Sequence, residues 1–354
     1  MSESLEIKVT LAKESKLKDL NLNNLPFGKF FTDHMLVATY SDGKWGSVEI
    51  KPYQSLAIDP SLAAIHYGQS IFEGIKAYKH QDDNAVIFRP YDNFKRFNIS
   101  AERMCMPEVP EYIFIEGMRK LIGLDKDWIP AQDNHSLYIR PFMFATDEII
   151  GVKPSDTYLF MIILCPTGPY YDAPMKIMVE ETYTRAAPGG VGFAKNAGNY
   201  GGSLLATKVA KTHGYDQVLW TDAFEHKWLQ EVGTMNVFFV IDNVAITPSL
   251  EEGTILAGVT RDTAITILKE MGLAVQERKI SIDELVEAYK SKTLHEVFGT
   301  GTAATISLIK ELKYKEEVLQ FDTTQLPVAK ELKNRLDKIR TGESSDNHQW
   351  LLTV

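Results

Sequence analysis

The sequence predicts an α+β protein built from two domains. It has 354 residues, 44% of them hydrophobic, which is more apolar material than a single core organises comfortably. Strand-like runs lead into stretches of helical spacing in both halves of the chain. Between the halves, prolines and glycines crowd into residues 166–175, a composition typical of a linker. We therefore expect a first domain over residues 1–170 and a second over residues 171–354.

The first half predicts a mixed sheet with helices packed against it. Asp42 and Gly43 supply the positive backbone angles of a tight hairpin turn inside residues 35–50. A second strand pair is expected on either side of residues 82–84. Periodicity predicts the other elements, which are a helix carrying Phe94, Phe97, Ile99 and Met104, a helix near Tyr112 to Ile122, and strands at Leu137 to Phe144 and Tyr158 to Leu164.

The second half begins with a predicted strand from Met175 to Glu180. Glycines end the next two helices, since Gly214 follows one over residues 203–213 and Gly272 follows one over residues 261–271. Further elements are a strand meander at Gln217 to Trp220, Asn236 to Ile241 and Val244 to Thr247, a helix started by the capping box of Ser281 and Glu284, and a last long helix from Pro327 to Ile339.

Composition and charge exclude several classes of protein. The formal net charge of -9 disfavours attraction to nucleic acid and to anionic membranes. The longest apolar run, Tyr158 to Cys165, is far shorter than the roughly 20 residues that span a bilayer. The N-terminus has neither a signal-peptide nor a transit-peptide pattern. Cys105 and Cys165 lie in apolar surroundings without CxxC spacing, as in a reducing compartment. We expect a soluble, cytoplasmic protein.

Residues 188–202 hold six glycines around one cation, Lys195. Glycine is tolerated where the backbone turns with positive φ or comes close to a ligand, so a flat, bulky cofactor would explain this density. A flexible surface loop explains it equally well on composition alone. The role of Lys195 therefore depends on the other candidate sites.

Three other segments could bind a cofactor. Gly258 to Arg261 brings a glycine turn into a predicted helix, whose first N–H groups and Thr260 hydroxyl suit a phosphate; an ordinary N-cap is the alternative. Gly299 to Ala304 is similar to a dinucleotide fingerprint, but the residues after it alternate like a strand where that motif needs a helix. Glu231 precedes an apolar strand, where a protonated heterocycle would compensate its charge, although a solvated turn is the simpler interpretation. The histidines show no metal-binding spacing.

The pattern as a whole resembles a known family. It is carried by Gly190 to Gly201 with Lys195, Glu231 to Asn236, Gly258 to Arg261 and Gly299 to Ala304, and it extends through Phe27 to Leu36, His66 to Ala77, Phe88 to Arg96 and Tyr138 to Pro141. These segments resemble the fold-type IV pyridoxal phosphate enzymes of aminotransferase class IV, and among them the branched-chain amino acid aminotransferases. The resemblance implies a smaller N-terminal α/β sandwich domain and a larger C-terminal pseudo-barrel domain.

The resemblance assigns cofactor-binding roles residue by residue. It makes Lys195 the lysine that holds pyridoxal 5'-phosphate as a Schiff base and the catalytic group that moves the proton between Cα and the cofactor. Glu231 would pair with the pyridine nitrogen, which makes the ring an electron sink, and Tyr200 would bind the phenolic oxygen. The phosphate would be held by Arg96, Val259, Thr260 and Thr302.

The resemblance also implies a substrate pocket and a partner. Tyr67 and the backbone around Ala303 would bind the α-carboxylate, and Arg140 would accommodate the distal carboxylate of glutamate. The pocket for the side chain, mostly aromatic, would consist of Phe27, Phe72, Tyr138, Tyr170 and Thr234. Ile150 and Val152 match a loop that reaches the partner subunit's site, which implies a homodimer.

The predicted reaction is the transfer of the amino group of leucine, isoleucine or valine to 2-oxoglutarate, which yields branched-chain 2-oxo acids and glutamate. Two other fold-type IV enzymes, a D-amino acid transaminase and an aminodeoxychorismate lyase, are the nearest alternatives. A non-enzymatic phosphate-binding protein is a more distant one. One methylene in an apolar pocket discriminates by only about 1 to 3 kcal/mol, so the pattern does not rank the three amino acids.

Overall fold

The computed structural model describes residues 6–21, 25–82, 84–170 and 173–354. Asp83 of the predicted second turn and Asp172 of the predicted linker lie outside these ranges. The described chain forms two compact units: residues up to 170, 194–197 and 339–354 make the first, and residues 173–193 and 198–338 make the second. Residues 339–354, which the sequence analysis assigned to the second domain, therefore belong to the first unit.

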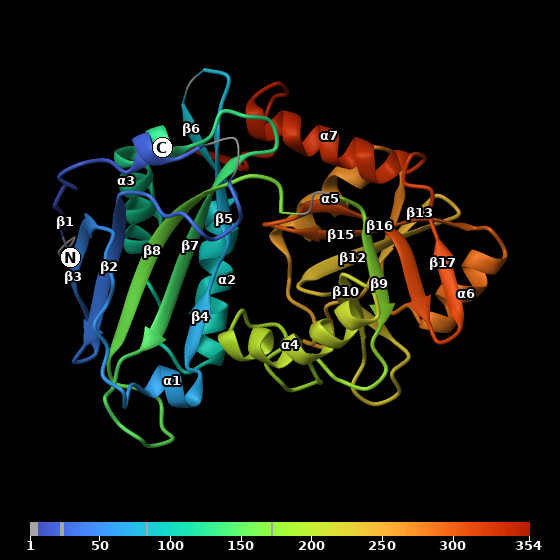
Figure 1. The fold of residues 1–354 in the computed structure, drawn as a ribbon, viewed down its shortest axis with the longest axis horizontal. Coiled ribbons are helices and arrows are strands. Elements are labelled where there is room, and N and C mark those ends of the chain that lie inside the picture. The colour runs from blue at the N-terminus through green and yellow to red at the C-terminus, as the bar shows by residue number, and fades with distance from the viewer. Residues whose placement is uncertain (1–5, 22–24, 83, 171–172) are drawn as a thin grey trace. The chain divides into compact units, whose positions relative to one another are not determined.

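In the part of the chain that the structure describes, the first unit is an open sheet of nine strands in the order β1-β3-β2-β8-β7-β5-β6-β18, with β4 beside β7. The strands are β1 (Ile7–Val9), β2 (His34–Ser41), β3 (Lys44–Pro52), β4 (Ser70–Phe72), β5 (Ile75–Lys79), β6 (Ala85–Phe88), β7 (Ser136–Ala145), β8 (Tyr158–Thr167) and β18 (Leu351–Thr353). The helical segments are η1 (Leu17–Asp19), α1 (Ala63–Tyr67), α2 (Pro90–Arg103), η2 (Tyr112–Glu116), α3 (Gly117–Leu124) and η3 (Lys126–Trp128). Figure 1 shows α2 and α3 behind this sheet.

The core of the first unit lies between the sheet and these helices. Phe97 of α2, Phe114 of η2 and Phe160 of β8 are buried, with ring centroids 5.4 to 5.8 Å apart. Aromatic pairs at this spacing add about 0.5 to 1.5 kcal/mol beyond the area they bury. Ile99 is 49% exposed, so it lies off the buried face of α2, although the predicted helix is confirmed.

The predicted strands of the first half are confirmed, with one difference at the linker. Asp42 and Gly43 form the β2–β3 turn with φ of 52° and 73°. β8, however, continues through Pro166 to Thr167, so the predicted linker begins inside a strand. Proline is tolerated there because β2 pairs with β8 only as far as Ile163, and the missing N–H breaks no ladder on that side.

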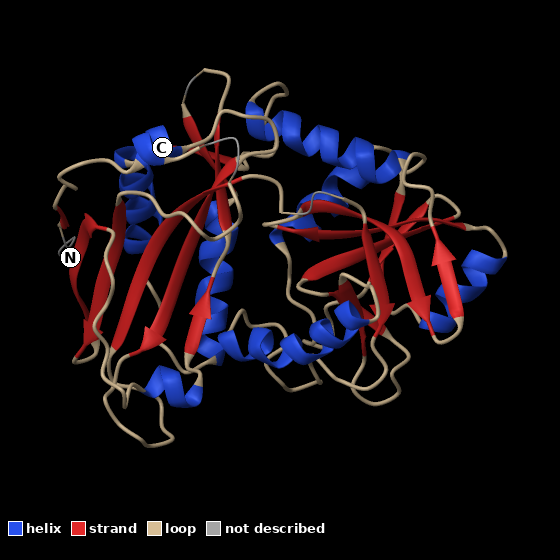
Figure 2. Ribbon diagram, in the orientation of Figure 1, coloured by secondary structure: helices blue, strands red, loops and turns tan. Residues whose placement is uncertain are grey.

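The second unit contains a closed six-stranded ring among its described residues. The strands β11 (Leu229–Val232), β10 (Gln217–Thr221), β9 (Met175–Val179), β16 (Thr305–Tyr314), β15 (Leu294–Gly301) and β12 (Met235–Ile241) pair in that order, and β12 pairs back with β11. This ring confirms the predicted pseudo-barrel. The remaining elements are β13 (Val244–Thr247), β14 (Ala274–Glu277), β17 (Glu317–Gln320), α4 (Ala197–Thr212), α5 (Val259–Glu270), α6 (Ile282–Lys290) and α7 (Pro327–Thr341). Figure 2 separates these helices from the strands by colour.

Three features of the second half differ from the prediction. β11 separates β10 from β12, so these strands do not form the simple meander. α4 begins at Ala197, and Gly198, Gly201 and Gly202 lie inside the helix although each costs about 1 kcal/mol there relative to alanine. Gly258 is the N-cap of α5, so Thr260 lies inside the helix and is not the cap.

Two other predictions for the second half are confirmed. Ser281 caps α6 by accepting a hydrogen bond from the Glu284 N–H at 3.0 Å. Residues 299–304 join two antiparallel strands, with Gly301 opposite Thr305. This hairpin leaves no strand-then-helix unit for a dinucleotide fingerprint. None of the described helices is long and apolar enough to cross a membrane.

Candidate active site

The backbone of Lys195 is fixed within the first unit. Its N–H donates to the Ser100 Oγ at 2.9 Å, and its carbonyl accepts from the Phe72 N–H at 3.1 Å. The neighbouring Asn196 forms a β-bridge with Ile71. These contacts tie the segment to α2 and β4. The Lys195 Nζ lies 4.9 Å from the centre of the Phe72 ring, within the range of a cation–π interaction.

Five of the predicted substrate residues contact one another in the first unit. The Arg140 Cζ lies 4.5 Å from the centre of the Phe72 ring, and its Nη2 donates to the Tyr138 hydroxyl at 3.0 Å. Phe27 packs edge-on against Tyr138 and Tyr170, with centroids 4.8 and 4.9 Å apart. The cluster therefore combines apolar ring surfaces with one fixed cation, and Lys195 lies at its Phe72 end.

Arg96 is held by a carboxylate that the sequence analysis did not single out. Its Nε and Nη2 lie 2.7 and 2.8 Å from the two carboxylate oxygens of Glu73, and Asn93 Nδ2 donates to the same carboxylate at 2.8 Å. Burial raises the pKa of Glu73, but the charge and hydrogen bonds of Arg96 outweigh it and leave the pKa below its usual value. The Ser100 Oγ, which accepts from Lys195, donates to the Arg96 carbonyl at 3.0 Å.

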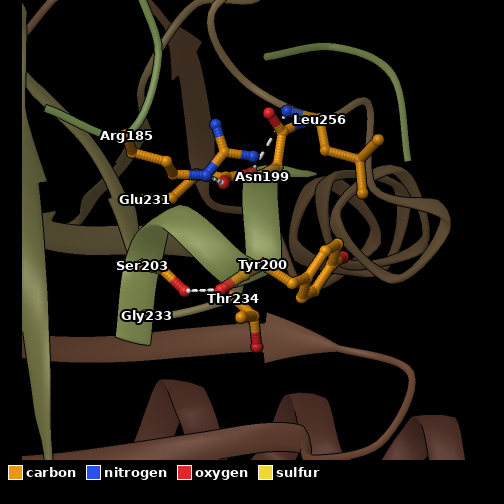
Figure 3. Close-up of a pocket in the computed structure, with 8 residues that line it drawn as sticks. All are labelled: Arg185, Asn199, Tyr200, Ser203, Glu231, Gly233, Thr234 and Leu256. Atoms are coloured by element: carbon orange, nitrogen blue, oxygen red, sulfur yellow. Dashed lines mark hydrogen bonds and ion pairs between the residues drawn. The ribbon is translucent and has the colours of Figure 1, made fainter. Parts of the chain in front are cut away.

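The second unit contains a pocket that collects three of the predicted residues. Its lining consists of Arg185, Asn199, Tyr200, Ser203, Glu231, Gly233, Thr234 and Leu256. Figure 3 shows that Tyr200 and Ser203 come from α4, with the Ser203 Oγ donating to the Tyr200 carbonyl at 2.8 Å. Glu231 comes from β11, and Thr234 follows in the turn to β12.

Glu231 is buried and held by three groups of the second unit. One oxygen accepts from the Leu256 N–H at 3.1 Å and from Asn236 Nδ2 at 3.4 Å. The other lies 2.6 Å from Arg185 Nε. The solvated-turn interpretation of Glu231 is therefore wrong. Arg185 was missed by the sequence analysis, although the principle that a buried acid needs a cation could have directed attention to the arginine just before the glycine-rich run.

The N-terminus of α5 is shaped so that a ligand can come close to its backbone. Gly258 provides no side-chain cap, and the first N–H groups of a helix have no partner within that helix. A Cβ on Gly258 would collide with the side chain of Asn236, so a larger residue here would force Asn236, a hydrogen-bond partner of Glu231, to move. Val259 and Thr260 are buried in the first turn.

The other predicted residues lie at turns and helix ends. Tyr67 is the last residue of α1 and is 40% exposed. Thr302 and Ala303 lie in the turn between β15 and β16. Ile150 and Val152 are 73% and 88% exposed in the loop before β8. The described residues contain no cluster of three or more His, Cys, Asp or Glu side chains arranged to bind a metal.

An open sheet that anchors a lysine, together with a closed barrel that buries a carboxylate, defines a two-domain α+β enzyme of fold-type IV. The family model for amino-transferase class IV matches residues 70–312. The chain belongs to this family.

Individual proteins are similar to this chain over nearly its whole length. Branched-chain-amino-acid aminotransferase 2 of Bacillus subtilis is 45% identical over 357 residues, which cover 99% of this chain and 97% of the relative. The solved branched-chain amino acid aminotransferase of Escherichia coli is 29% identical with a TM-score of 0.75, covering 90% of this chain and 98% of the other. A third relative is the branched-chain amino acid aminotransferase of T.th., solved in complex with N-(5'-phosphopyridoxyl)-L-glutamate. It is 27% identical with a TM-score of 0.71, and the match covers 89% of this chain and 97% of the other.

Proposed function

We propose that this protein is a branched-chain aminotransferase that transfers the amino group of leucine, isoleucine or valine to 2-oxoglutarate. The observation that carries the proposal is the cluster of Phe27, Phe72, Tyr138 and Arg140 beside Lys195. The similarity to the Bacillus subtilis enzyme over 99% of the chain supports the same activity.

The proposed cofactor is pyridoxal 5'-phosphate, and the donor set of this chain suits it. A lysine amine can bind its aldehyde, a helix N-terminus without a side-chain cap can bind its phosphate, and a buried carboxylate can pair with its ring nitrogen. The Thr300 Oγ1, on β15 just before Thr302, is buried without a hydrogen-bond partner among the described residues, and a ligand oxygen would satisfy it. When bound, the cofactor withdraws electrons from the substrate Cα and so makes its proton removable.

Each residue keeps a distinct task in this proposal. Lys195 attaches the cofactor and then removes and returns the proton at the substrate Cα, while Glu231 keeps the ring nitrogen protonated and Tyr200 binds the phenolic oxygen. The proposed phosphate ligands are Arg96, Val259, Thr260 and Thr302.

The aromatic cluster explains how one pocket can accept two kinds of substrate. Phe27, Phe72, Tyr138, Tyr170 and Thr234 would contact an aliphatic side chain, which gains about 0.8 kcal/mol per buried methylene. Arg140, fixed by the Tyr138 hydroxyl, would bind the distal carboxylate of glutamate as a fork. Tyr67 and the backbone around Ala303 would bind the α-carboxylate common to both substrates.

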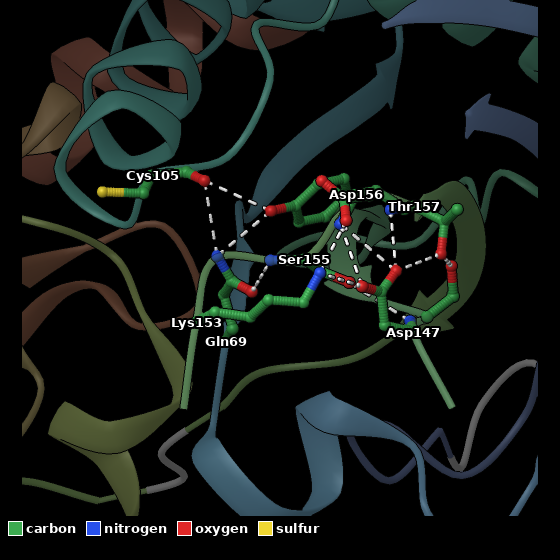
Figure 4. A network of polar contacts seen from close by, with 9 residues as sticks. Gln69, Cys105, Asp147, Lys153, Ser155, Asp156 and Thr157 are labelled. Atoms are coloured by element: carbon green, nitrogen blue, oxygen red, sulfur yellow. Dashed lines mark hydrogen bonds and ion pairs between the residues drawn. The ribbon is translucent and has the colours of Figure 1, made fainter. Parts of the chain in front are cut away.

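We also propose a homodimer in which the loop carrying Ile150 and Val152 reaches the partner. Figure 4 shows the network at the base of this loop. Asp147 accepts hydrogen bonds from the Asp156 N–H and from the N–H and Oγ1 of Thr157, between 2.7 and 3.2 Å. Burial raises the pKa of Asp147, but these bonds lower it far below its usual value. The loop is thus held in shape while its apolar tip stays exposed.

Replacement of Lys195 tests the catalytic assignment. Lys195→Ala should lower turnover of leucine with 2-oxoglutarate at least about a hundredfold, because it removes both the attachment point and the proton-transfer group. Glutamate formation measures turnover, and borohydride reduction followed by peptide mass mapping should locate the pyridoxyl group on Lys195. Lys208→Ala, an exposed lysine of α4, is the control.

Three results would contradict the proposal. Wild-type turnover in Lys195→Ala would remove Lys195 from the mechanism. Activity with D-alanine and none with L-leucine would indicate a D-amino acid transaminase. Pyruvate release from aminodeoxychorismate without an amino acceptor would indicate a lyase.

A further inference from the structure

The guanidinium of Arg185 joins three separate segments of the second unit. Its Nε lies 2.6 Å from the Glu231 Oε2 on β11, its Nη1 donates to the Thr254 carbonyl at 2.8 Å, and its Nη2 donates to the Gly192 carbonyl at 3.3 Å. The Arg185 side chain is only 9% exposed, and that of Glu231 3%. All three nitrogens of the fork therefore have acceptors inside the protein.

The two loops that Arg185 joins are also packed too closely for any residue but glycine at position 192. A Cβ at Gly192 would lie 2.6 Å from the Thr254 carbonyl oxygen and 2.6 Å from the Ala186 Cβ. Arg185 thus bridges two segments whose close contact depends on the absence of a side chain at Gly192. The bridge forms one wall of the pocket lined by Tyr200, Glu231 and Thr234 (Figure 3).

This geometry has an electrostatic consequence for Glu231. A carboxylate removed from water needs a compensating charge or it takes up a proton. Arginine is a cation that proteins do not deprotonate, and its planar fork fixes the direction of its partner. The Leu256 N–H and Asn236 Nδ2 hold the other carboxylate oxygen, so the orientation of Glu231 is set before any ligand binds.

We propose that Arg185 is a positioning residue of the aminotransferase: it keeps the Glu231 carboxylate ionised and oriented, so that the ring nitrogen of pyridoxal 5'-phosphate stays protonated. This inference rests on the proposed function for the identity of the group that Glu231 meets. Its first half, that Arg185 controls the charge of Glu231, concerns the protein alone and can be measured without cofactor.

The experiment is a double-mutant cycle of wild type, Arg185→Gln, Glu231→Gln and the double variant, with Arg185→Lys as the conservative change. Arg278→Gln, which removes a half-exposed arginine paired with Glu284, is the matched control. The measurements are kcat and KM for leucine, the pH dependence of the cofactor's visible absorbance, and the isotope-edited infrared band of the Glu231 carboxylate in the cofactor-free protein.

Arg185→Gln should lower kcat about ten- to hundredfold, as removal of an outer-shell partner does, with little change in KM. The pH profile of the absorbance should shift, and the Glu231 infrared band should move to the position of a protonated acid. Arg185→Lys should restore most of kcat because it restores the charge. The double variant should be no slower than Glu231→Gln, since Arg185 is inferred to act only through Glu231.

Other results would overturn the inference. Arg185 would have only a structural role if the kcat losses of Arg185→Gln and Glu231→Gln multiplied in the double variant. The same would follow if the pH profile of the cofactor's absorbance in Arg185→Gln matched that in Arg278→Gln. If Arg185→Gln does not fold, the kcat of the neutral double variant, compared with the kcat of Glu231→Gln, tests by itself whether Arg185 acts only through Glu231. If the wild type does not bind pyridoxal 5'-phosphate, the proposed function fails, whereas an unchanged infrared band of the Glu231 carboxylate in cofactor-free Arg185→Gln refutes the role of Arg185 itself.

Discussion

Glu73 carries its charge at a position without exposed surface, so the stability of the first unit is sensitive to its replacement. A buried ion pair adds little when complete, but removal of one partner leaves an uncompensated charge in a medium that solvates it poorly. Here the remaining charge would be that of Arg96, one of the proposed phosphate ligands. Stability and cofactor binding are thus connected at a single side chain.

Glu73→Gln is expected to lower the free energy of unfolding of the cofactor-free protein by about 3 to 5 kcal/mol, the usual cost of breaking a buried pair. Urea unfolding followed by tryptophan fluorescence measures it. Combining Glu73→Gln with Arg96→Met should cost less than the sum of the single changes, because the second change removes the stranded charge. Unchanged stability in Glu73→Gln would show that the carboxylate does not hold Arg96.

Single residues could be singled out from the sequence where a local pattern marks them, but not where their partner is distant. Lys195 and Glu231 stand in short recognisable runs, and the structure gives each several well-defined contacts. Arg185 and Glu73 have no such run around them, because their importance comes from neighbours far along the chain. Sequence spacing cannot report a contact between residues 73 and 96 that depends on how β4 meets α2.

Asp222 organises the turn between β10 and β11. Its carboxylate accepts hydrogen bonds from the N–H groups of Phe224, Glu225, Lys227 and Trp228 at 2.8 to 3.0 Å. Burial raises the pKa of Asp222, but these backbone donors outweigh it and lower the pKa to about 2. The turn leads directly into β11, the strand that carries Glu231.

This depressed pKa predicts a specific loss of stability in acid. The contribution of Asp222 is complete above the unfolded value of 3.8 and is lost as the pH falls through about 2. Asp222→Asn should therefore be less stable than wild type by about 1 to 3 kcal/mol at pH 7, and the difference should shrink between pH 4 and pH 2. Glu251→Gln, an exposed carboxylate of the same unit, should show no such convergence; a constant difference for Asp222→Asn would contradict the assignment.

The elements were predicted from periodicity, which succeeds when one face of an element is apolar. β7 and α6 have such faces and were found, whereas β8 was found because its run from Tyr158 to Cys165 is apolar throughout. β11 reads Leu-Gln-Glu-Val and is buried throughout. Because two of its four residues are polar, it has no apolar pattern from which a strand could be predicted. The glycines of α4 kept its first residues, 197–202, out of the predicted helix for a related reason: helix propensity disfavours glycine, and tertiary packing overrides propensity.

At the scale of the whole molecule, the exposed apolar tip at Ile150 and Val152 predicts association. Light scattering should give a mass twice the 39.9 kDa of the chain. The double variant Ile150→Asp/Val152→Asp should raise the dissociation constant of the dimer at least about tenfold, because two-fold symmetry repeats each change across the interface. Phe224→Asp, at a residue that is 77% exposed in the second unit, is the control. A monomeric wild type would refute the dimer.

The two-unit organisation followed from length and from the proline-rich stretch, but the path of the chain did not. Residues 194–197 and 339–354 return to the first unit, and the sequence pattern gives no sign that either segment leaves the second unit. β18 pairs with β6 through Leu351 and Phe88, and Trp350 lies beside Phe88 with centroids 5.9 Å apart. A short strand of three residues has too little pattern to reveal a partner so distant.

That late strand also sets an order of events during synthesis. β6 emerges from the ribosome early, yet its neighbour β18 is made only after the entire second unit. Domains usually fold as they are made, the N-terminal one first, but here the first unit must keep one edge of its sheet open until β18 arrives. An open edge is a template for pairing with other chains. The first unit therefore starts folding before the second and finishes after it, and its exposure to aggregation lasts for that interval.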